Sequence, residues 1–470
     1  MILEKAFGLP ISEIDPSFSK LEDDDDDEDY IPIEGLPEDV DYSHDEEKYI
    51  RKLPEEVRAK IIEHEKSLIQ FNKETIPQRF KILQSDLDVS TKSHIIKKLD
   101  HFYSLETTDN EYHKLSQWTE YLNKLPFGKY TDPVVKMTDS PANIIDHLKN
   151  VKSTLDKAVF GHNRAKNQII QIIAQQITNP GCTGNCIAIQ GPPGNGKTTL
   201  VREGICKSIN RPFRSIPLGG MQNSDFLLGH EYTYEGSKPG RIVEILMECG
   251  SMDPVIYFDE LDKISESPKG EEIANLLCHL TDLSQNTEFH DKYFSGVNFD
   301  LSRAIFIFSY NDEKKVNPIL LDRMIKIHTN GFKTNDKVNI SKQYLIPSVC
   351  KSIGFDTKDL SITDDTIKNI ISSYTDDEKG VRNLRRCFET IISKINVLKL
   401  INRSVEEKIE EPVKKNKITL EISEPKKSPD GIVSFNLNKF ELPIKINDKL
   451  VKKLIDVDKE DNTSYLAMYL

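Results

Sequence analysis

The chain of 470 residues has little cysteine, a single tryptophan and no long apolar run. Its seven cysteines are scattered, odd in number and form no Cys-x-x-Cys pair, which argues against a disulfide framework or a zinc site and predicts reduced thiols. Apolar runs such as 305–308 fall far short of the roughly 18 residues that a membrane-spanning helix needs. The first residues lack the basic and apolar pattern of a signal or transit peptide. We therefore expect a cytoplasmic protein without membrane contact.

Basic residues are outnumbered by acidic ones, and the imbalance is confined to one end of the chain. The sequence carries 63 Lys and Arg against 76 Asp and Glu, a formal net charge of −13, and residues 1–50 hold 18 of the acidic and 3 of the basic residues. The remainder is therefore close to neutral, which argues against a nucleic-acid-binding body. The unbroken acidic block 22–29 predicts that residues 1–45 are disordered, because like charges at this density repel one another. Such an arm either keeps the protein soluble or docks a partner.

Hydrophobic periodicity divides the rest of the chain. Apolar residues at steps of three and four predict an all-helical region over 46–130, which carries no chemistry of its own. Short apolar strands that alternate with helices between about 190 and 330 predict an α/β fold with a mostly parallel sheet. The pattern is helical again over 334–402, and residues 403–470 form a small C-terminal region that ends in a short helix. The strands are expected at 187–190, 255–258 and 304–308.

Residues 191–198 match the phosphate-binding pattern G-x-x-x-x-G-K-[ST] at every fixed position, between a predicted strand and a predicted helix. Glycines allow successive backbone N–H groups to converge on phosphate oxygens, and the helix that follows adds its positive N-terminal end. We expect Lys197 to reach the β- and γ-phosphates of a nucleotide and the Thr198 hydroxyl to ligate Mg2+. The residues predicted to contact the nucleotide are Gly191, Pro192, Pro193, Gly194, Asn195, Gly196, Lys197, Thr198 and Thr199.

Two other predicted strands also end in polar side chains. Asp259 follows the strand at 255–258 and can hold Mg2+ through water, and Glu260 is then placed to polarise the attacking water. The alternative for this acidic pair is the capping of a turn, but its place 62 residues after Lys197 favours the metal site. Asn311, beyond the next apolar strand, can orient water near the γ-phosphate.

Two arginines complete this ordered series. Arg323 follows the end of a predicted helix, a position that suits an arginine finger, and Arg382 stands two residues after a glycine in the helical region that follows. For either arginine taken alone, a surface salt bridge is the commoner explanation. Their order after the phosphate-binding segment and the acidic strand end favours a role in ATP hydrolysis.

The order of these motifs resembles the AAA+ ATPases, and further motifs make the chain similar to the ATPase part of Lon proteases. The similarity covers roughly residues 75–402, well over half of the chain. It includes a linker with the sequence YLNKLPFGKY and a loop with the sequence GHEYTYEG that is followed by a Pro-Gly pair. The motifs that carry the resemblance lie at 121–130, 155–161, 229–240, 259–263, 320–324, 344–347 and 380–382.

The resemblance implies a large αβα ATPase domain over 131–332 and a helical lid domain over 333–402. It also implies a ring, usually a hexamer, that binds ATP and Mg2+ and acts on a protein substrate. In such a ring Arg323 is the finger that serves the neighbouring subunit's ATP, Asn311 is the sensor 1 residue and Arg382 is sensor 2.

The resemblance also indicates which residues contact the adenine base and which residue contacts the protein substrate. Phe160 and Gly161 belong to a segment that packs on adenine, and Tyr234 corresponds to the central-pore aromatic that grips an extended polypeptide. Without a ring, Tyr234 is simply an exposed loop tyrosine. Glu231 and Glu235 stand where the family usually has basic or apolar residues, which predicts a weakened or altered grip.

Lon proteases continue past the lid into a peptidase domain with a Ser–Lys dyad. The 68 residues after 402 contain no motif of that kind, so we expect no peptide-bond cleavage by this chain. The leading hypothesis is an ATP-dependent protein unfoldase or remodeller that acts as a homo-hexamer on a protein client. The alternative is an ATP-gated scaffold or adaptor ring that docks a separate protease or another partner. A nucleic-acid-remodelling ATPase is disfavoured by the near-neutral body.

Overall fold

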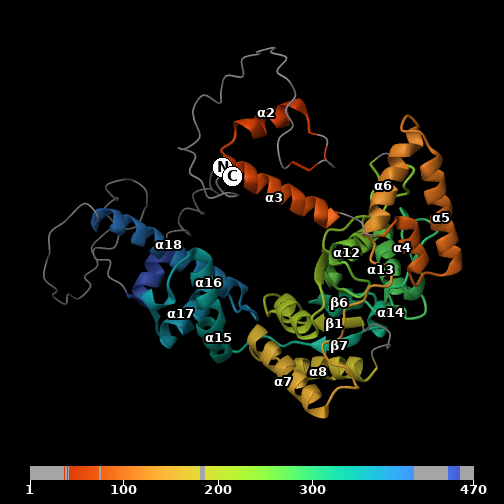
Figure 1. Cartoon of the computed structure of the whole chain (residues 1–470). Coiled ribbons are helices and arrows are strands. Elements are labelled where there is room, and N and C mark those ends of the chain that lie inside the picture. The colour runs from red at the N-terminus through yellow and green to blue at the C-terminus, as the bar shows by residue number, and fades with distance from the viewer. Residues whose placement is uncertain are drawn as a thin grey trace, which may run out of the picture. The chain divides into compact units, whose positions relative to one another are not determined.

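A computed structural model describes residues 36–37, 40, 42–72, 76–179, 186–234, 236–406 and 443–455 (Figure 1). The arm up to residue 35, residues 407–442 of the C-terminal region, and Glu235 lie outside the described residues. The chain divides into two compact units, Met1–Pro77 and Gln78–Leu470. The second unit contains all of the motifs described above, so the fold that positions the candidate site is the fold of this unit.

Two helices make up most of the described part of the first unit, α2 (His44–Lys52) and α3 (Glu55–Asn72). Ser43 and Glu46 form a reciprocal capping box at the start of α2, in which the Ser43 backbone N–H donates to Glu46 Oε2 at 2.8 Å. The Arg58 guanidinium donates to three carbonyl oxygens at the end of α2 and in the turn after it. These bonds hold the two helices together.

Three further helices open the second unit: α4 (Gln78–Gln84), α5 (Val89–Ser104) and α6 (Asn110–Lys124). The Asp88 carboxylate caps α5 by accepting from the backbone N–H of Thr91 at 3.0 Å. The hairpin of α5 and α6 contributes buried side chains to the same hydrophobic core as the central sheet, among them Ile95, Leu99, Trp118 and Leu122. Among the described helices none is both long enough and apolar enough to cross a membrane.

A five-stranded parallel sheet in the order β2-β3-β6-β1-β7 forms the centre of the large domain, which confirms the predicted α/β fold. The strands are β1 (Cys186–Gln190), β2 (Phe213–Pro217), β3 (Val255–Asp259), β6 (Ile305–Tyr310) and β7 (Ile325–His328). Sequence analysis anticipated only the three central strands, because strands that are buried on both faces form continuous apolar runs. Each edge strand has a single buried residue, Ile216 in β2 and Ile327 in β7. The polar residues in these strands interrupt the apolar run by which a buried strand is recognised.

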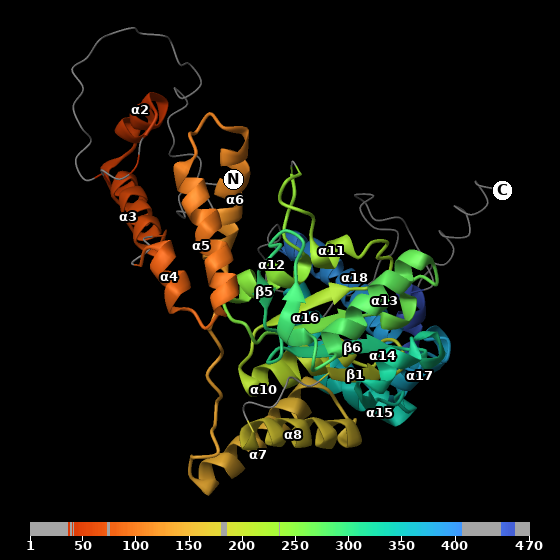
Figure 2. The same cartoon turned by 90° about the vertical axis from the view of Figure 1, so that its right-hand side faces the viewer.

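Helices cover both faces of the sheet (Figures 1 and 2). Ile256 and Phe258 of β3 point into one core with α5, α6, α12 and α13, and Val255 and Tyr257 point into the other core with α7, α8 and the helix after β1. The helices and their bounds are α7 (Pro141–Ala158), α8 (Asn163–Thr178), α9 (Lys197–Thr199), η3 (Leu200–Cys206), α10 (Lys207–Ile209), α12 (Arg241–Cys249) and α13 (Pro268–Thr281). The elements α9, η3 and α10 run on as one helix, whose middle part is π-helical.

Short elements connect these layers. They are α11 (Asp225–Leu228), η4 (Leu261–Lys263), η5 (Asn286–Glu288), β4 (Phe289–His290), β5 (Asn298–Phe299), η6 (Glu313–Lys315) and α14 (Pro318–Asp322).

The lid has its own hydrophobic core and is not purely helical. Its described elements are α15 (Thr334–Ile340), η7 (Ser341–Leu345), α16 (Ile346–Ile353), η8 (Thr357–Asp359), β8 (Leu360–Ile362), α17 (Asp364–Tyr374) and α18 (Arg382–Glu406). Strand β8 pairs in parallel with β9 (Ile444–Ile446), and a helix at 448–455 adds Val451 and Leu454 to the lid core. Residues 443–455, which sequence analysis separated from the lid, therefore complete it. A three-residue strand whose partner lies about 80 residues away leaves no local pattern to predict.

Candidate functional site

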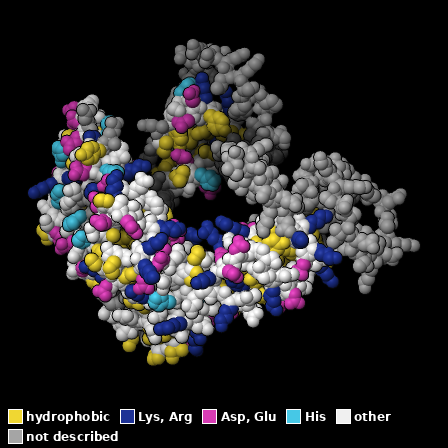
Figure 3. All heavy atoms as spheres, turned by 180° about the vertical axis from the view of Figure 1, so that it is seen from behind, with side chains coloured by type: hydrophobic (Ala, Val, Ile, Leu, Met, Phe, Trp, Pro, Cys, Tyr) yellow, Lys and Arg dark blue, Asp and Glu magenta, His cyan; other side chains and the backbone are white. Residues whose placement is uncertain are grey.

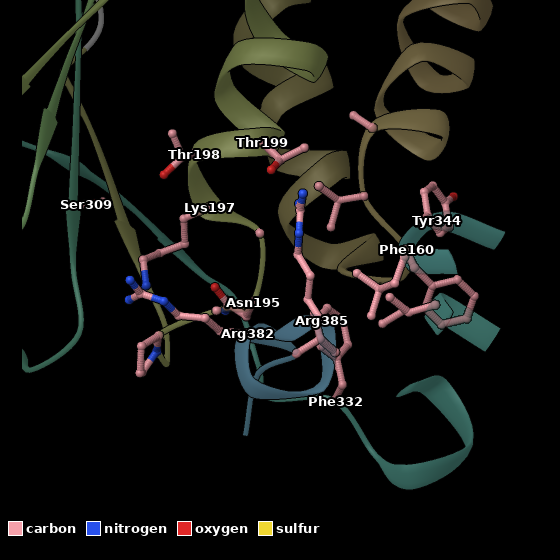
Figure 4. A pocket seen from close by; sticks show the side chains of 18 of the residues that line it. Phe160, Asn195, Lys197, Thr198, Thr199, Ser309, Phe332, Tyr344, Arg382 and Arg385 are labelled. Atoms are coloured by element: carbon pink, nitrogen blue, oxygen red, sulfur yellow. The ribbon is translucent and has the colours of Figure 1, made fainter. Parts of the chain in front are cut away.

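A cavity of about 530 Å³ lies between the carboxyl ends of the central strands and the lid (Figure 4). Ligands of open parallel sheets bind at this edge. Figure 3 shows Lys and Arg side chains gathered where the large domain and the lid meet. The residues singled out by sequence that line the cavity are Phe160, Pro193, Gly194, Asn195, Gly196, Lys197, Thr198, Thr199, Asp259, Glu260, Asn311 and Arg382.

The loop that follows β1 has a backbone that only glycine permits at three positions. A Cβ on Gly191 would lie 2.1 Å from Thr329 Oγ1, and Gly194 and Gly196 have φ angles of +73° and +90°. The Asn195 amide donates to Thr329 Oγ1 at 2.7 Å and so fixes the loop to the segment after β7. This close approach leaves the loop no room to widen, which suits a cradle for phosphate oxygens.

Lys197 is the first residue of α9, and its side chain reaches back to the start of this loop. Its ammonium donates to the carbonyl oxygens of Gly191 and Pro192 at 2.7 and 3.1 Å and to Asn311 Oδ1 at 2.9 Å. Burial lowers the pKa of Lys197, while Asp259 and another nearby carboxylate act in the opposite direction. The contact between Lys197 and Asn311 joins two residues that are 114 positions apart in the chain.

The predicted metal ligands Thr198 and Asp259 are joined by hydroxyl groups. The Tyr257 hydroxyl lies 3.1 Å from Thr198 Oγ1 and donates to Asp259 Oδ1 at 3.3 Å, and Ser309 also donates to Asp259 Oδ1. Burial raises the pKa of Tyr257 to about 12, so its hydroxyl stays protonated at neutral pH. A hydroxyl and a carboxylate are the oxygen donors that Mg2+ takes from proteins, alongside waters and nucleotide phosphates. The residues present therefore fit a magnesium ion.

Glu260 stands next to this pair with a left-handed backbone, φ 62°. Its backbone N–H donates to Asp259 Oδ1 at 3.0 Å, and its carboxylate is paired with Lys263. The same carboxylate lies against Gly219, where a Cβ would come within 2.3 Å of Glu260 Oε2. The glycine therefore leaves space for the carboxylate at the cavity wall.

The lid reaches the phosphate-binding loop through the start of α18. The Val381 N–H donates to the Gly194 carbonyl at 3.0 Å, and a Cβ on Gly380 would lie 2.2 Å from the Pro193 carbonyl oxygen. Arg382 and a second arginine, Arg385, line the cavity from the same helix. In the view of Figure 4 Arg382 extends toward Lys197 and Arg385 toward Thr199.

The opposite end of the cavity is mostly apolar and aromatic. Phe160 and Phe332 line it with Tyr344, whose hydroxyl donates to the Asp156 carbonyl at 2.9 Å. His162 packs on Phe332 with ring centroids 5.0 Å apart, and burial lowers its pKa. Gly161 does not line the cavity but has a φ of +69°, which turns the chain between α7 and α8. A flat aromatic base such as adenine fits an end of this composition.

Five of the predicted site residues do not line the cavity: Gly161, Gly191 and Pro192, which are next to lining residues or close to them in the chain, and Arg323 and Tyr234, which lie elsewhere. The Arg323 guanidinium donates to the Cys278 carbonyl at 2.5 Å and pairs with Asp282 at 3.2 Å, at the C-terminal end of α13. Tyr234 is 66% exposed in the loop between α11 and α12. Neither side chain reaches the nucleotide cavity of its own chain.

Sequence analysis assigned no role at the site to six of its polar or aromatic residues: Tyr257, Ser309, Phe332, Tyr344, Ser348 and Arg385, although Tyr344 stands in one of the motifs that carry the resemblance. Tyr257 carried a signal, because it is the one polar residue within an apolar strand and shares a face with Asp259 two positions later. Arg385 carried another, since it lies three residues after Arg382 on the same helix. Phe332 stands in an irregular segment and had no such signal.

Two protein families match the chain, one over the large domain and one over the lid. The family of ATPases associated with various cellular activities (AAA) matches residues 187–331, and the Lon protease AAA+ ATPase lid domain matches residues 351–410. Among solved structures, a closed-state reconstruction of Hsp104 with ATPγS and casein overlaps with 56% of this chain and 50% of that chain, at 16% identity and a TM-score of 0.44.

Curated relatives are Lon proteases of viral, bacterial and mitochondrial kinds. A Lon protease homolog of Acanthamoeba polyphaga mimivirus is 35% identical over 69% of this chain and 32% of its own length. The Lon protease of Desulfosudis oleivorans is 34% identical over 75% of this chain and 40% of its own. A mitochondrial homolog of Schizosaccharomyces pombe is 32% identical over 84% of this chain and 35% of its own. The chain thus spans well under half the length of these relatives, and the shared part is a Lon-type AAA+ ATPase module.

Proposed function

We propose that the chain hydrolyses ATP in a ring and uses the energy to unfold or remodel a protein client, without proteolytic activity of its own. The observation that carries this proposal is the convergence of Lys197, Asp259, Glu260, Asn311 and Arg382 on one cavity from four separate segments of the chain. Membership of the AAA ATPase family supports the ATPase part. The action on a protein client rests on the loop that bears Tyr234.

The cavity residues have complementary tasks in phosphoryl transfer. Lys197 and Arg382 supply positive charge at the phosphate end, and Glu260 and Asn311 position the attacking water there. Mg2+, when bound with ATP, neutralises charge on the phosphate oxygens. Positioning of this kind needs rigid support, and the glycine contacts of the phosphate-binding loop supply it.

Arg323 is proposed to act on the ATP of a neighbouring subunit. Its guanidinium lies outside its own cavity and is held at the end of α13 by Asp282 and the Cys278 carbonyl. An arginine held in this way is preorganised but remains one-third exposed, so it is available to a second copy of the chain. An arginine that acts in this way requires a neighbouring subunit, and the resemblance to Lon supports a homo-hexamer as the assembly that supplies it.

The loop from Gly229 to Pro239 supports the action on a polypeptide. A β-bridge between these two residues closes its base, and Tyr234 lies exposed beyond it. The Lys98 ammonium sits 4.1 Å from the Tyr232 ring and 4.8 Å from the Trp118 ring, so the α5–α6 hairpin braces the loop from one side. A braced loop with an exposed aromatic can transmit force to a bound chain.

The alternative is the ATP-gated scaffold that docks a separate protease or another partner. One observation favours it: the exposed side chain of Glu231 places negative charge in the same loop as Tyr234. A negative charge beside Tyr234 would weaken the grip on acidic clients by like-charge repulsion.

The test compares ATPase rates of the wild type, Tyr234→Ala and Tyr103→Ala with and without a chemically unfolded, carboxymethylated protein. Tyr103 is a matched control, since it is 65% exposed but lies on α5. Stimulation in the wild type and in Tyr103→Ala that is lost in Tyr234→Ala supports the unfoldase. Absence of stimulation in the wild type, with ATP-dependent assembly retained, favours the scaffold.

A second experiment asks whether a client is held and whether it is cleaved. Glu260→Gln is expected to bind ATP and to turn it over at least about 100-fold more slowly, because the group that directs water loses its charge. A pull-down with this variant in ATP should retain the client uncut. Wild-type turnover in Glu260→Gln would show that the base is assigned wrongly, and cleaved client would refute the absence of peptidase activity.

A further inference from the structure

One tyrosine hydroxyl lies between the two residues that are expected to hold Mg2+. Tyr257 is fully buried in β3, whose neighbouring residues Val255, Ile256 and Phe258 are apolar. Its hydroxyl is 3.1 Å from Thr198 Oγ1 and 3.3 Å from Asp259 Oδ1. A phenylalanine would fill nearly the same volume, so the hydroxyl is an addition that packing alone does not require.

The protons of this contact can be assigned from the number of donors. An ionised carboxylate has no proton to give, so Tyr257 donates its single proton to Asp259. The Thr198 hydroxyl must then donate to the Tyr257 oxygen, since either atom of that pair can be the donor and Tyr257 has no second proton. With its proton directed at Tyr257, the Thr198 oxygen has its lone pairs free for a cation.

The Asp259 carboxylate is ordered in the same way. Tyr257, the Ser309 hydroxyl and the Glu260 backbone N–H all donate to Oδ1. No described residue donates a hydrogen bond to Oδ2, so that oxygen is left for a metal-bound water. One oxygen of the carboxylate is thus held by three donors of the protein, and the other accepts no hydrogen bond from the described residues.

We infer that Tyr257 is a positioning residue for the metal: its hydroxyl orients Thr198 and Asp259 so that Mg2+ binds more tightly to the nucleotide complex. This inference rests on the proposed nucleotide site. Tyr257 contacts both expected ligands and lies deeper than either, so it acts through them. Its removal should weaken metal binding and leave the contacts of the nucleotide with Lys197 and with the aromatic end of the cavity unchanged.

The chain offers a matched control in Tyr310 of β6. This tyrosine is also fully buried, and its hydroxyl has no hydrogen-bond partner among the described residues. Tyr310→Phe therefore removes a buried hydroxyl from the same sheet without breaking a bond to a metal ligand. Any effect of Tyr257→Phe that Tyr310→Phe lacks comes from the contacts with Thr198 and Asp259.

The experiment measures equilibrium binding of a fluorescent ATP analogue to the full chain, first in EDTA and then across a Mg2+ titration. For Tyr257→Phe we expect the affinity in EDTA to stay within about twofold of wild type and the Mg2+ concentration at half-saturation to rise about three- to tenfold, the range for the loss of one or two buried hydrogen bonds. Tyr310→Phe should match wild type in both. A half-saturation in Tyr257→Phe equal to wild type, or an equal shift in Tyr310→Phe, overturns the inference.

A double variant separates positioning from a local packing defect. If Tyr257 acts through Thr198, adding Tyr257→Phe to Thr198→Ala should shift the Mg2+ half-saturation much less than it does in the wild-type background. Full additivity would contradict the inference. Failure of the wild type to bind the analogue in EDTA and in Mg2+ would instead refute the proposed function.

Discussion

Two loops of the large domain are held in contrasting ways. The loop at 191–196 is confined by its own backbone, by glycines without room for a Cβ and by the carbonyl contacts of Lys197. The loop from Gly229 to Pro239 leaves Tyr234 exposed, and side chains from α5 and α6 support it. A site that binds a small anion needs rigidity, whereas a loop that meets a polypeptide needs an exposed tip on a braced base.

The largest effect is expected on the first loop. Lys197→Ala should lower the affinity for the ATP analogue by about 100-fold, because charge-assisted hydrogen bonds to phosphate contribute roughly 1.5–3 kcal/mol each. Binding measured by fluorescence checks this. Lys207→Ala is the control, since Lys207 lies on the same continuous helix but pairs with Glu203 at the surface. Equal losses in the two variants would show that positive charge on the helix, and not the loop, determines affinity.

A smaller effect should appear at the brace of the second loop. Lys98→Met keeps the length and packing of the side chain and removes the charge between the Tyr232 and Trp118 rings, an interaction of about 1 kcal/mol. We expect basal ATPase within about twofold of wild type and a client-stimulated rate about three- to fivefold lower. The exposed neighbour variant Lys97→Met serves as control. Retained stimulation in Lys98→Met would mean that the loop works without its brace.

The last prediction concerns stability rather than binding or activity, namely how pH changes the contact between Asp291 and Gly240, the residue that follows the second loop. The buried Asp291 carboxylate accepts from the Gly240 N–H at 2.8 Å, and burial raises its pKa from 3.8 to about 7. The folded state therefore holds this proton more tightly than the unfolded chain, and the resulting stability is complete below about pH 4 and lost as pH rises through 7. From pH 5 to 8 the free energy of unfolding should fall by about 2.5 kcal/mol more in the wild type than in Asp291→Asn. Denaturant unfolding at several pH values measures the difference, and parallel curves would contradict it.

The fold was predictable where burial leaves a continuous apolar run. The three central strands and the parallel sheet follow from such runs, and the AAA and Lon lid matches confirm the fold class and the family. The edge strands β2 and β7 and the pairing of β8 with β9 were not predictable. These strands contain no continuous apolar run. Each of them forms because it pairs with a strand that lies far away in the chain.

The candidate site, like the fold, has one part that the sequence predicts and another that it does not. The roles expected of Glu260, Asn311 and Arg382 remain predictions, but the structure brings all three to the cavity that Lys197 lines. Arg385 and Phe332 line the same cavity and were missed, because their part in it depends on how the lid meets the large domain. A sequence motif identifies residues that are close together in the chain. It cannot identify residues that reach the same site from distant segments.

By itself the sequence determined the phosphate-binding loop, because its glycines and Lys197 act within eight consecutive residues whose chemistry does not depend on distant partners. Only the tertiary structure decided that Tyr257 meets Thr198 across 59 positions and that Lys98 meets Tyr232. The physical reason is that hydrogen bonds and ring contacts act over a few ångströms. The packing of whole helices and strands, and not the local pattern, decides which distant side chains come within that range.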